Sequence, residues 1–389
     1  MKAGWEIKSL GEIADIQSGS GFPEKYQGIS NHNIPFYKVS DMNLVGNERE
    51  MIFQNNTISE LVRTQLGASI FPEGSTIFPK IGGAIFTNKK RITSKDSCVD
   101  NNVMGAIPKK NKVDSQFLYY FFQSHDLVEF ANDAHLPSIR KTVVESWPIK
   151  IPLSITEQQR IVALLDQTFE GITKARENAE QNLQNVRALF ESHLQSAFTQ
   201  RGDVWVEKKL GEVVELDKTQ HKPNNALPYV GMEDIESDTG NFIGSKEPRK
   251  VKSSTFHFNV SHVLYGRLRP YLNKVLLPDF EGHCSTEVFP LKPNSEVARE
   301  FLFYWVSLNS TKDKINATCT GARMPRANMN DVLTFEFFYP SLNVQNIIVQ
   351  NLKELSKETR YLEALYQRKI ALLDELKKSL LQQAFAGEL

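Results

Sequence analysis

The stretch Trp-Glu-Ile-Lys-Ser-Leu-Gly-Glu at residues 5–12 returns as Trp-Val-Glu-Lys-Lys-Leu-Gly-Glu at residues 205–212. Five of these eight positions are identical at an offset of 200 residues, and such self-similarity is typical of a repeated structural unit. A chain of 389 residues is also too long for one hydrophobic core of the usual size. The sequence therefore predicts two copies of one plan.

The two copies stay in step beyond this opening motif. Cys98 corresponds to Cys284 at an offset of 186, and the aromatic stretch 117–120 corresponds to 301–304. Each copy closes in a strand-like run that ends at proline, residues 147–152 and 335–340. Runs such as Val143–Pro152 and Ser261–Leu264 predict strands, so each copy is expected to be a mixed α/β unit whose strand order the sequence does not give.

Beyond each closing proline, the apolar period changes from two to about 3.5 residues, which indicates a helix. Adding 187 to each seam position of the first segment gives the seam of the second, so two matched seams predict a coiled coil. Roughly 40 residues make a helix of about 60 Å. The first seam is Ile161, Leu165, Thr168, Ile172, Ala175, Ala179, Leu183, Val186, Phe190, His193 and Ala197.

The ends of the helical segments predict four parts of the chain. Polar residues that can cap a helix follow Pro152 and Pro340, and Gly202 precedes the second copy of the opening motif. The predicted parts are residues 1–153, 154–201, 202–341 and 342–389. The first helix is joined to the second copy by only a few residues. So short a connection favours antiparallel helices and two units related by an approximate two-fold axis. That symmetry is expected of a protein that reads two separated half-sites on a DNA duplex.

Composition sets few limits on the partner. Lys and Arg total 46, as do Asp and Glu, so the net charge is zero. Phosphate contacts require a local basic face and not a basic average, so DNA binding is compatible with this balance. No apolar run approaches the roughly 20 residues that span a bilayer, and the first residues lack a signal-peptide core, so we expect a cytoplasmic protein without membrane contact. The three cysteines, Cys98, Cys284 and Cys319, have no spacing typical of a disulfide framework or zinc site.

The opening motif and the helix start together carry a family resemblance. Trp-x-x-Lys-x-Leu-Gly-Glu opens each copy, and Pro-Leu-Ser-Ile-Thr-Glu-Gln-Gln-Arg-Ile-Val occupies residues 152–162. The whole chain resembles the specificity subunit of Type I restriction-modification systems, in which two target-recognition domains alternate with two helices. The implied fold class is α+β, a pseudo-two-fold tandem repeat with two long antiparallel coiled-coil helices. Residues 344–349 depart from the pattern, which leaves open whether both helix starts contact partner subunits identically.

This resemblance implies a non-catalytic subunit that binds double-stranded DNA, two modification (methyltransferase) subunits and restriction subunits. S-adenosylmethionine, ATP and Mg²⁺ are then expected on the partner subunits, with no cofactor on this chain. The sequence has no phosphate-binding loop and no Asn-Pro-Pro-Tyr methyltransferase motif, so we assign no catalytic residue. One alternative is a coiled-coil scaffold that joins two protein-binding domains, which suits the zero net charge. A self-contained methyltransferase or nuclease would require catalytic motifs that the sequence lacks.

Candidate DNA contacts in the first copy lie on both sides of a glycine turn at residues 82–83. Glycine permits a close approach of backbone to phosphate, and a basic cluster supplies the charge. The alternative is a hairpin with a solvated charged tip. The candidates are Lys80, Lys89, Lys90 and Arg91.

The equivalent place in the second copy holds Arg267, Arg269, Asn273 and Lys274, with the two arginines at strand-like spacing. The arginine fork suits guanine edges or phosphates, although a structural salt bridge is an alternative. A later loop of each copy supplies the remaining candidates, which are Ser138, Arg140 and Lys141 in the first copy and Arg323 and Arg326 in the second.

Overall fold

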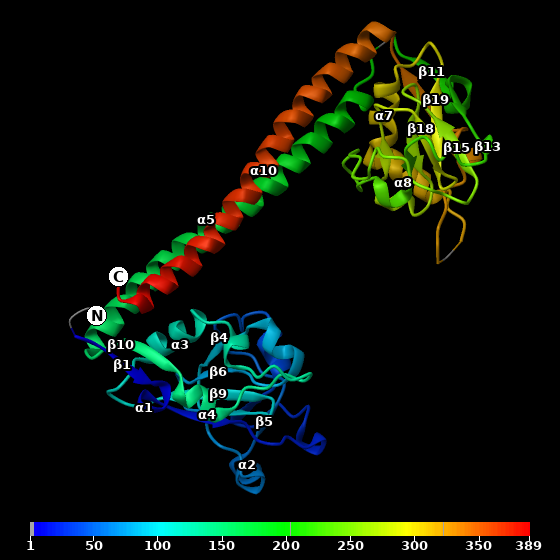
Figure 1. Cartoon of the computed structure of the whole chain (residues 1–389). Helices are drawn as coiled ribbons and strands as arrows, with labels where there is room; N and C mark the ends of the chain where they lie inside the picture. The colour runs from blue at the N-terminus through cyan, green and yellow to red at the C-terminus, as the bar shows by residue number, and fades with distance from the viewer. Residues whose placement is uncertain (1–3, 203, 322) are drawn as a thin grey trace. The chain divides into compact units, whose positions relative to one another are not determined.

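The computed structural model describes residues 4–202, 204–321 and 323–389. It divides into two compact units: unit 1 comprises Met1–Asn178 with Lys369–Leu389, and unit 2 comprises Ala179–Arg368. Each unit contains one α/β copy and part of both long helices, α5 (Ile155–Thr199) and α10 (Leu342–Ala386) (Figure 1). The compact units thus cut each long helix in two, whereas the predicted parts of the chain treat each helix as a separate segment.

Unit 1 is built on a five-stranded sheet of order β2-β9-β6-β7-β4 and a three-stranded sheet of order β5-β3-β8, with β1 paired to β10. Its strands are β1 (Trp5–Ser9), β2 (Ala14–Ser18), β3 (Ile34–Tyr37), β4 (Glu50–Met51), β5 (Thr57–Ile58), β6 (Thr76–Pro79), β7 (Arg91–Thr93), β8 (Cys98–Val99), β9 (Val103–Pro108) and β10 (Pro148–Pro152). Its short helices are α1 (Leu10–Ile13), α2 (Glu60–Leu66), α3 (Ser115–Gln123) and α4 (Lys141–Ser146).

Unit 2 has two four-stranded sheets of order β12-β19-β16-β17 and β13-β15-β18-β14, with β11 paired to β20. Its strands are β11 (Val206–Lys209), β12 (Val214–Leu216), β13 (Gln220–His221), β14 (Tyr229–Val230), β15 (Thr255–Phe258), β16 (Val263–Gly266), β17 (Val275–Leu276), β18 (Gly282–Ser285), β19 (Val288–Pro293) and β20 (Glu336–Tyr339). Its short helices are α6 (Leu210–Val213), α7 (Arg299–Ser307), α8 (Asn309–Ala317) and α9 (Met329–Val332).

The pairing of strands confirms the internal repeat. β3 pairs in parallel with β8 through Phe36 and Cys98, and β14 pairs in parallel with β18 through Val230 and Cys284. Both cysteines are fully buried in these equivalent strands. Two mixed α/β units with an equivalent pair of parallel strands are therefore present, as the sequence predicts.

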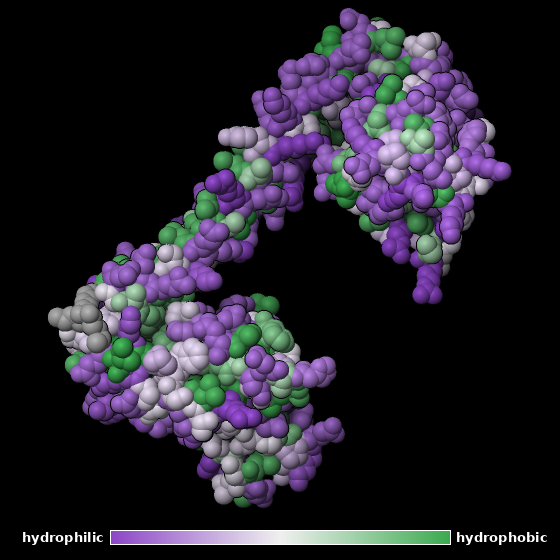
Figure 2. Space-filling model, viewed as in Figure 1, coloured by the Kyte–Doolittle hydropathy of each residue, from purple (hydrophilic) through white to green (hydrophobic). Residues whose placement is uncertain are grey.

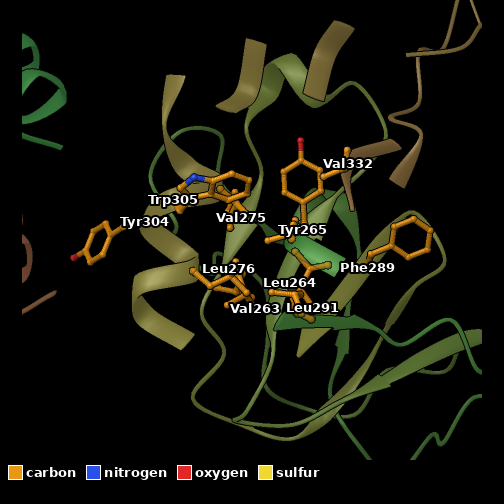
Figure 3. Close-up of a cluster of buried hydrophobic side chains, with 14 of the residues drawn as sticks. Val263, Leu264, Tyr265, Val275, Leu276, Phe289, Leu291, Tyr304, Trp305 and Val332 are labelled. Carbon is orange, nitrogen blue, oxygen red and sulfur yellow. The ribbon is translucent and has the colours of Figure 1, made fainter. Parts of the chain in front are cut away.

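A central strand of each unit is buried along its whole length. All four residues of β6 and all four of β16 are buried, so both faces of each strand are covered. In unit 2, Val263, Leu264 and Tyr265 of β16 gather with side chains of β17 and β19 (Figure 3).

The two long helices run antiparallel within each unit. In unit 1 the Arg176 Nε lies 3.3 Å from the Asp374 Oδ1, and in unit 2 the Arg187 Nε lies 3.1 Å from the Glu363 Oε1. Numbers that rise along α5 therefore fall along α10. The two predicted seams are confirmed except at His193 and Lys377, which are exposed; Leu194, next to His193, is buried instead.

A buried glutamine fixes the start of each long helix in the same way. The Gln158 Oε1 accepts from the Asp114 backbone N–H at 2.8 Å, and its Nε2 donates to the Pro152 carbonyl at 2.8 Å. The Gln345 Oε1 accepts from the Ala298 N–H at 2.8 Å, and its Nε2 donates to the Pro340 carbonyl at 2.8 Å. The two helix starts share this internal clamp although their sequences otherwise differ.

One predicted strand is partly wrong. Residues 141–146 form helix α4, and the strand begins only at Pro148. Thr142, Val143 and Val144 have strand propensity, but Val144 is fully buried against the core of unit 1, and packing overrides a weak local preference. Within the described ranges, no helix is both long and apolar enough to cross a membrane.

Candidate nucleic-acid interface

Two loops of unit 1 meet just beyond the end of β6. The Gly82 N–H donates to the Pro137 carbonyl at 2.8 Å, and the Ile139 N–H donates to the Lys80 carbonyl at 2.9 Å. Ile81 and Ser138 form an antiparallel bridge between these bonds. We call this meeting of residues 80–82 with 137–139 the loop crossing of unit 1.

Unit 2 has the same loop crossing, made by residues 267–269 and 325–327. The Arg269 N–H donates to the Pro325 carbonyl at 2.7 Å, and the Ala327 N–H donates to the Arg267 carbonyl at 2.9 Å. Leu268 and Arg326 form the antiparallel bridge. The sequence places these residues in two separate loops of each copy, and the structure brings the two loops together in both units.

A third segment supports each loop crossing. The Lys80 N–H donates to the Asn102 carbonyl at 2.8 Å in unit 1, and the Arg267 N–H donates to the Glu287 carbonyl at 2.9 Å in unit 2. Asn102 directly precedes β9, as Glu287 directly precedes β19. Lys80, Ser138 and Asn102 are thus equivalent to Arg267, Arg326 and Glu287, so a shared backbone presents different side chains.

Glu287 holds two of the predicted arginines of unit 2. Its carboxylate accepts from the Arg267 Nε at 3.0 Å and from the Arg326 Nε at 2.9 and 3.1 Å. The Arg326 Nη2 also lies 2.9 Å from the Glu287 Oε1, and the Arg267 guanidinium lies 4.9 Å from the centre of the Phe289 ring. Arg267 and Arg326 therefore form the structural salt bridges that the sequence allows as the alternative to DNA contact. One carboxylate between two guanidinium groups still leaves one net positive charge.

Two predicted contacts are corrected by their burial. Lys90 is 1% exposed and donates to the Asn88 Oδ1 at 2.6 Å and to the His125 carbonyl at 2.7 Å. Burial lowers the pKa of Lys90 to about 8. Asn273 is 5% exposed and donates to the Ser307 carbonyl at 2.9 Å. Neither side chain is presented to a ligand, because each serves the interior of its unit.

The other basic residues after the turns have protein partners but remain partly exposed. Lys274 donates to the Met232 carbonyl at 2.6 Å. Lys89 donates to the Asn43 side chain, and Arg91 donates to the Met42 carbonyl at 3.1 Å. Lys89 and Arg91 also line a cavity of about 1270 Å³ in unit 1, beside Arg49 and Lys174. They remain candidates for phosphate contacts.

The later loops keep three exposed basic side chains. Arg140 and Lys141 are exposed at the start of α4, where the Lys141 Nζ lies 3.5 Å from the Glu145 Oε1, and Arg323 is exposed in unit 2. On the visible face of the molecule, hydrophobic residues form patches among more numerous hydrophilic ones (Figure 2). Among the described residues, no group of three His, Cys, Asp or Glu side chains is placed to hold a metal ion.

Sequence reasoning missed Glu287 and Asn102. Asn102 lies four residues after Cys98 and Glu287 lies three residues after Cys284, so an alignment on the cysteines misses their equivalence by one residue. Their roles depend on a backbone hydrogen bond to the end of the preceding buried strand, and the sequence contains no sign of that bond.

The chain belongs to the family of the Type I restriction modification DNA specificity domain, whose family model matches residues 2–182 and 203–371. Both α/β copies and most of both long helices fall within the match. Recognition of a DNA target is the function that defines this family. The two loop crossings have equivalent backbone hydrogen bonds and carry different polar side chains.

Individual relatives agree with this assignment. The chain is 24% identical over 318 residues to the Type I restriction enzyme EcoDI specificity subunit of Escherichia coli, covering 71% of this chain and 70% of that protein. It is 22% identical over 246 residues to the MjaIX specificity subunit of Methanocaldococcus jannaschii, covering 58% of this chain and 55% of that protein.

Solved structures share the fold. One, described as the structural basis underlying complex assembly and conformational transition of the type I R-M system, matches with a TM-score of 0.79 at 16% identity and covers 100% of this chain and 99% of that chain. The HsdS subunit from Thermoanaerobacter tengcongensis matches with a TM-score of 0.64 at 17% identity and covers 100% of this chain and 98% of that chain. Two α/β units with long helices are therefore a known architecture.

Proposed function

We propose that this chain reads a bipartite, asymmetric site on double-stranded DNA, one half with each unit, and directs modification and restriction subunits to that site. The observation that carries the proposal is the pair of loop crossings. Their backbone hydrogen bonds agree, while the side chains that they carry differ. A common frame with unlike polar groups is what two readers of unlike half-sites require.

The side chains differ in the chemistry that distinguishes base pairs. Lysine, at position 80, offers a compact ammonium group, and serine, at position 138, offers one hydroxyl donor to base edges or phosphates. Arginines, at positions 267, 269 and 326, offer a fork of donors that matches the two acceptors of guanine. The exposed basic residues of the later loops, Arg140, Lys141 and Arg323, would hold the backbone of the duplex, which adds affinity without sequence information.

Catalysis belongs, in this proposal, to the partner subunits. Two modification subunits would carry S-adenosylmethionine, restriction subunits would use ATP and Mg²⁺, and this chain would bind none of these groups. The absence of phosphate-loop and methyltransferase motifs from the sequence supports this division. A related structure concerns complex assembly of the type I R-M system, which agrees with a subunit that works within an assembly.

Methylome sequencing tests the proposal. Cells that express the chain together with its neighbouring modification subunit are compared with cells that express the modification subunit alone. We expect a methyladenine motif in two halves, separated by unspecified bases, that is present only with the chain. If the two proteins copurify and no motif depends on the chain, the scaffold alternative becomes the better account.

A further inference from the structure

Arg269 has an unusual backbone conformation. Its φ of 50° and ψ of 63° lie in the left-handed region, where a side chain with a Cβ atom is strained. In the described part of the chain, five residues other than glycine have positive φ, and four of them are Asn or Asp, which tolerate this region. Arg269 is the fifth, and it has no such local compensation.

The equivalent residue of unit 1 is Gly82, with a φ of 67°. Gly82 and Arg269 make the same backbone hydrogen bond to Pro137 and Pro325 respectively. The loop crossing therefore imposes left-handed backbone at this position in both units. Unit 1 meets the requirement with glycine, the residue that adopts it without strain, whereas unit 2 retains an arginine there.

The Arg269 side chain is the free one of the three arginines at the loop crossing of unit 2. Arg267 and Arg326 are tied to Glu287, whereas Arg269 is exposed and its side chain has no hydrogen-bond or ion-pair partner among the residues that the structure describes. Backbone strain at a residue whose side chain has no partner within the protein is the pattern expected where that side chain is required for binding.

We infer that Arg269 selects a guanine in the half-site read by unit 2. Glu287 is then a positioning residue, because its carboxylate holds both Arg267 and Arg326. The inference rests on the proposed function and deepens it. Arginine donates in a bidentate manner to the O6 and N7 atoms of guanine in the major groove. A phosphate contact would not need this position, because arginine on relaxed backbone nearby would supply it equally well.

Three substitutions at position 269 distinguish the effect of the guanidinium group from the effect of the backbone strain. Arg269→Gly removes the side chain and the strain, Arg269→Ala removes the side chain but keeps a Cβ, and Arg269→Lys keeps the charge but loses the fork. Each full-length variant is expressed with the neighbouring modification subunit for methylome sequencing. Lys252→Ala, at an exposed lysine elsewhere in unit 2, serves as the control.

We expect all three variants to accept other bases at one guanine of one half-site, with discrimination reduced about tenfold or more, while the other half and the spacing stay unchanged. The thermal unfolding midpoint of Arg269→Gly should exceed that of Arg269→Ala, because only glycine relieves the strain. The control should keep the wild-type motif.

Two results are distinguishable failures. If the wild-type chain specifies no motif at all, the proposed function fails and the inference falls with it. If the wild-type motif exists and remains unchanged with Arg269→Gly and Arg269→Ala, the inference is overturned while the proposed function stands.

Discussion

Lys90 lies in a cluster of three consecutive basic residues, yet it is an interior side chain. Its ammonium group donates to Asn88 and to the His125 carbonyl, and burial lowers its pKa from 10.5 to about 8. A run of basic residues in a sequence cannot show which member turns inward. The burial of Lys90 depends on contacts such as that with His125, 35 positions away, which the local pattern does not contain.

The lowered pKa of Lys90 predicts a pH dependence of stability. Between about pH 8 and 10.5 the unfolded chain still holds a proton that the folded chain has released, so the free energy of unfolding rises with pH in this window. Relative to Lys90→Met, the wild type should gain on the order of 2–3 kcal/mol from pH 7 to pH 10.5. Urea unfolding of both proteins across this range measures the difference. A difference that does not change with pH would refute the assignment.

Glu287 should contribute to the stability of unit 2. Glu287→Gln keeps the shape of the side chain but removes the charge that pairs with Arg267 and Arg326, so we expect the free energy of unfolding to fall by about 1–2 kcal/mol. Glu281→Gln is the matched control, because Glu281 makes one exposed contact with His257. That control should change stability by less than about 0.5 kcal/mol. Equal effects of the two substitutions would argue against a special role for Glu287.

Residue-level prediction from the sequence succeeds where the repeat supplies the information. The two loops that carry Lys80 and Ser138 align with those that carry Arg267 and Arg326, so the amino-acid sequence alone identifies them as equivalent. Backbone conformation is not recognisable in this way. The left-handed φ of Arg269 depends on the hydrogen bond to Pro325, a contact 56 residues away along the chain.

Among the elements, the long helices are the most predictable. The residues of each seam recur at intervals of three and four over the whole length of the helix. So many positions agree with the helical period that the prediction does not depend on any one of them. Short elements are less predictable, because α4 is helical in spite of its β-branched residues. In a segment of six residues, the burial of one side chain outweighs the local preferences.

The buried glutamines predict the sensitivity of the helix starts. Gln158→Leu should leave the Asp114 N–H and the Pro152 carbonyl without their partner, and Gln345→Leu should do the same at Ala298 and Pro340. An unsatisfied buried group costs about 1–3 kcal/mol, so each substitution should lower the thermal unfolding midpoint by several degrees. Gln159→Leu, at the exposed neighbour, should have little effect. A similar decrease of the unfolding midpoint in all three variants would contradict a special role of the two buried glutamines.

At the scale of the whole molecule, the account predicts that the long helices set the spacing between the half-sites. Removal of residues 180–186 and 364–370 takes one heptad from each helix and preserves the spacing of both seams. Seven residues shorten a helix by about 10 Å, which corresponds to about three base pairs. Methylome sequencing should then show unchanged half-sites with fewer bases between them. An unaltered number of bases between the half-sites would show that the helices do not set this spacing.

The central claim is that each unit reads its own half of the target. The most direct measurement is methylome sequencing of two full-length variants, each expressed with the neighbouring modification subunit. One variant alters the loop crossing of unit 1 by Lys80→Ala and Ser138→Ala, and the other alters that of unit 2 by Arg269→Gly. The account predicts that each variant relaxes a different half of one bipartite motif. It would be contradicted if both variants relaxed the same half, or if the motif were unchanged in both.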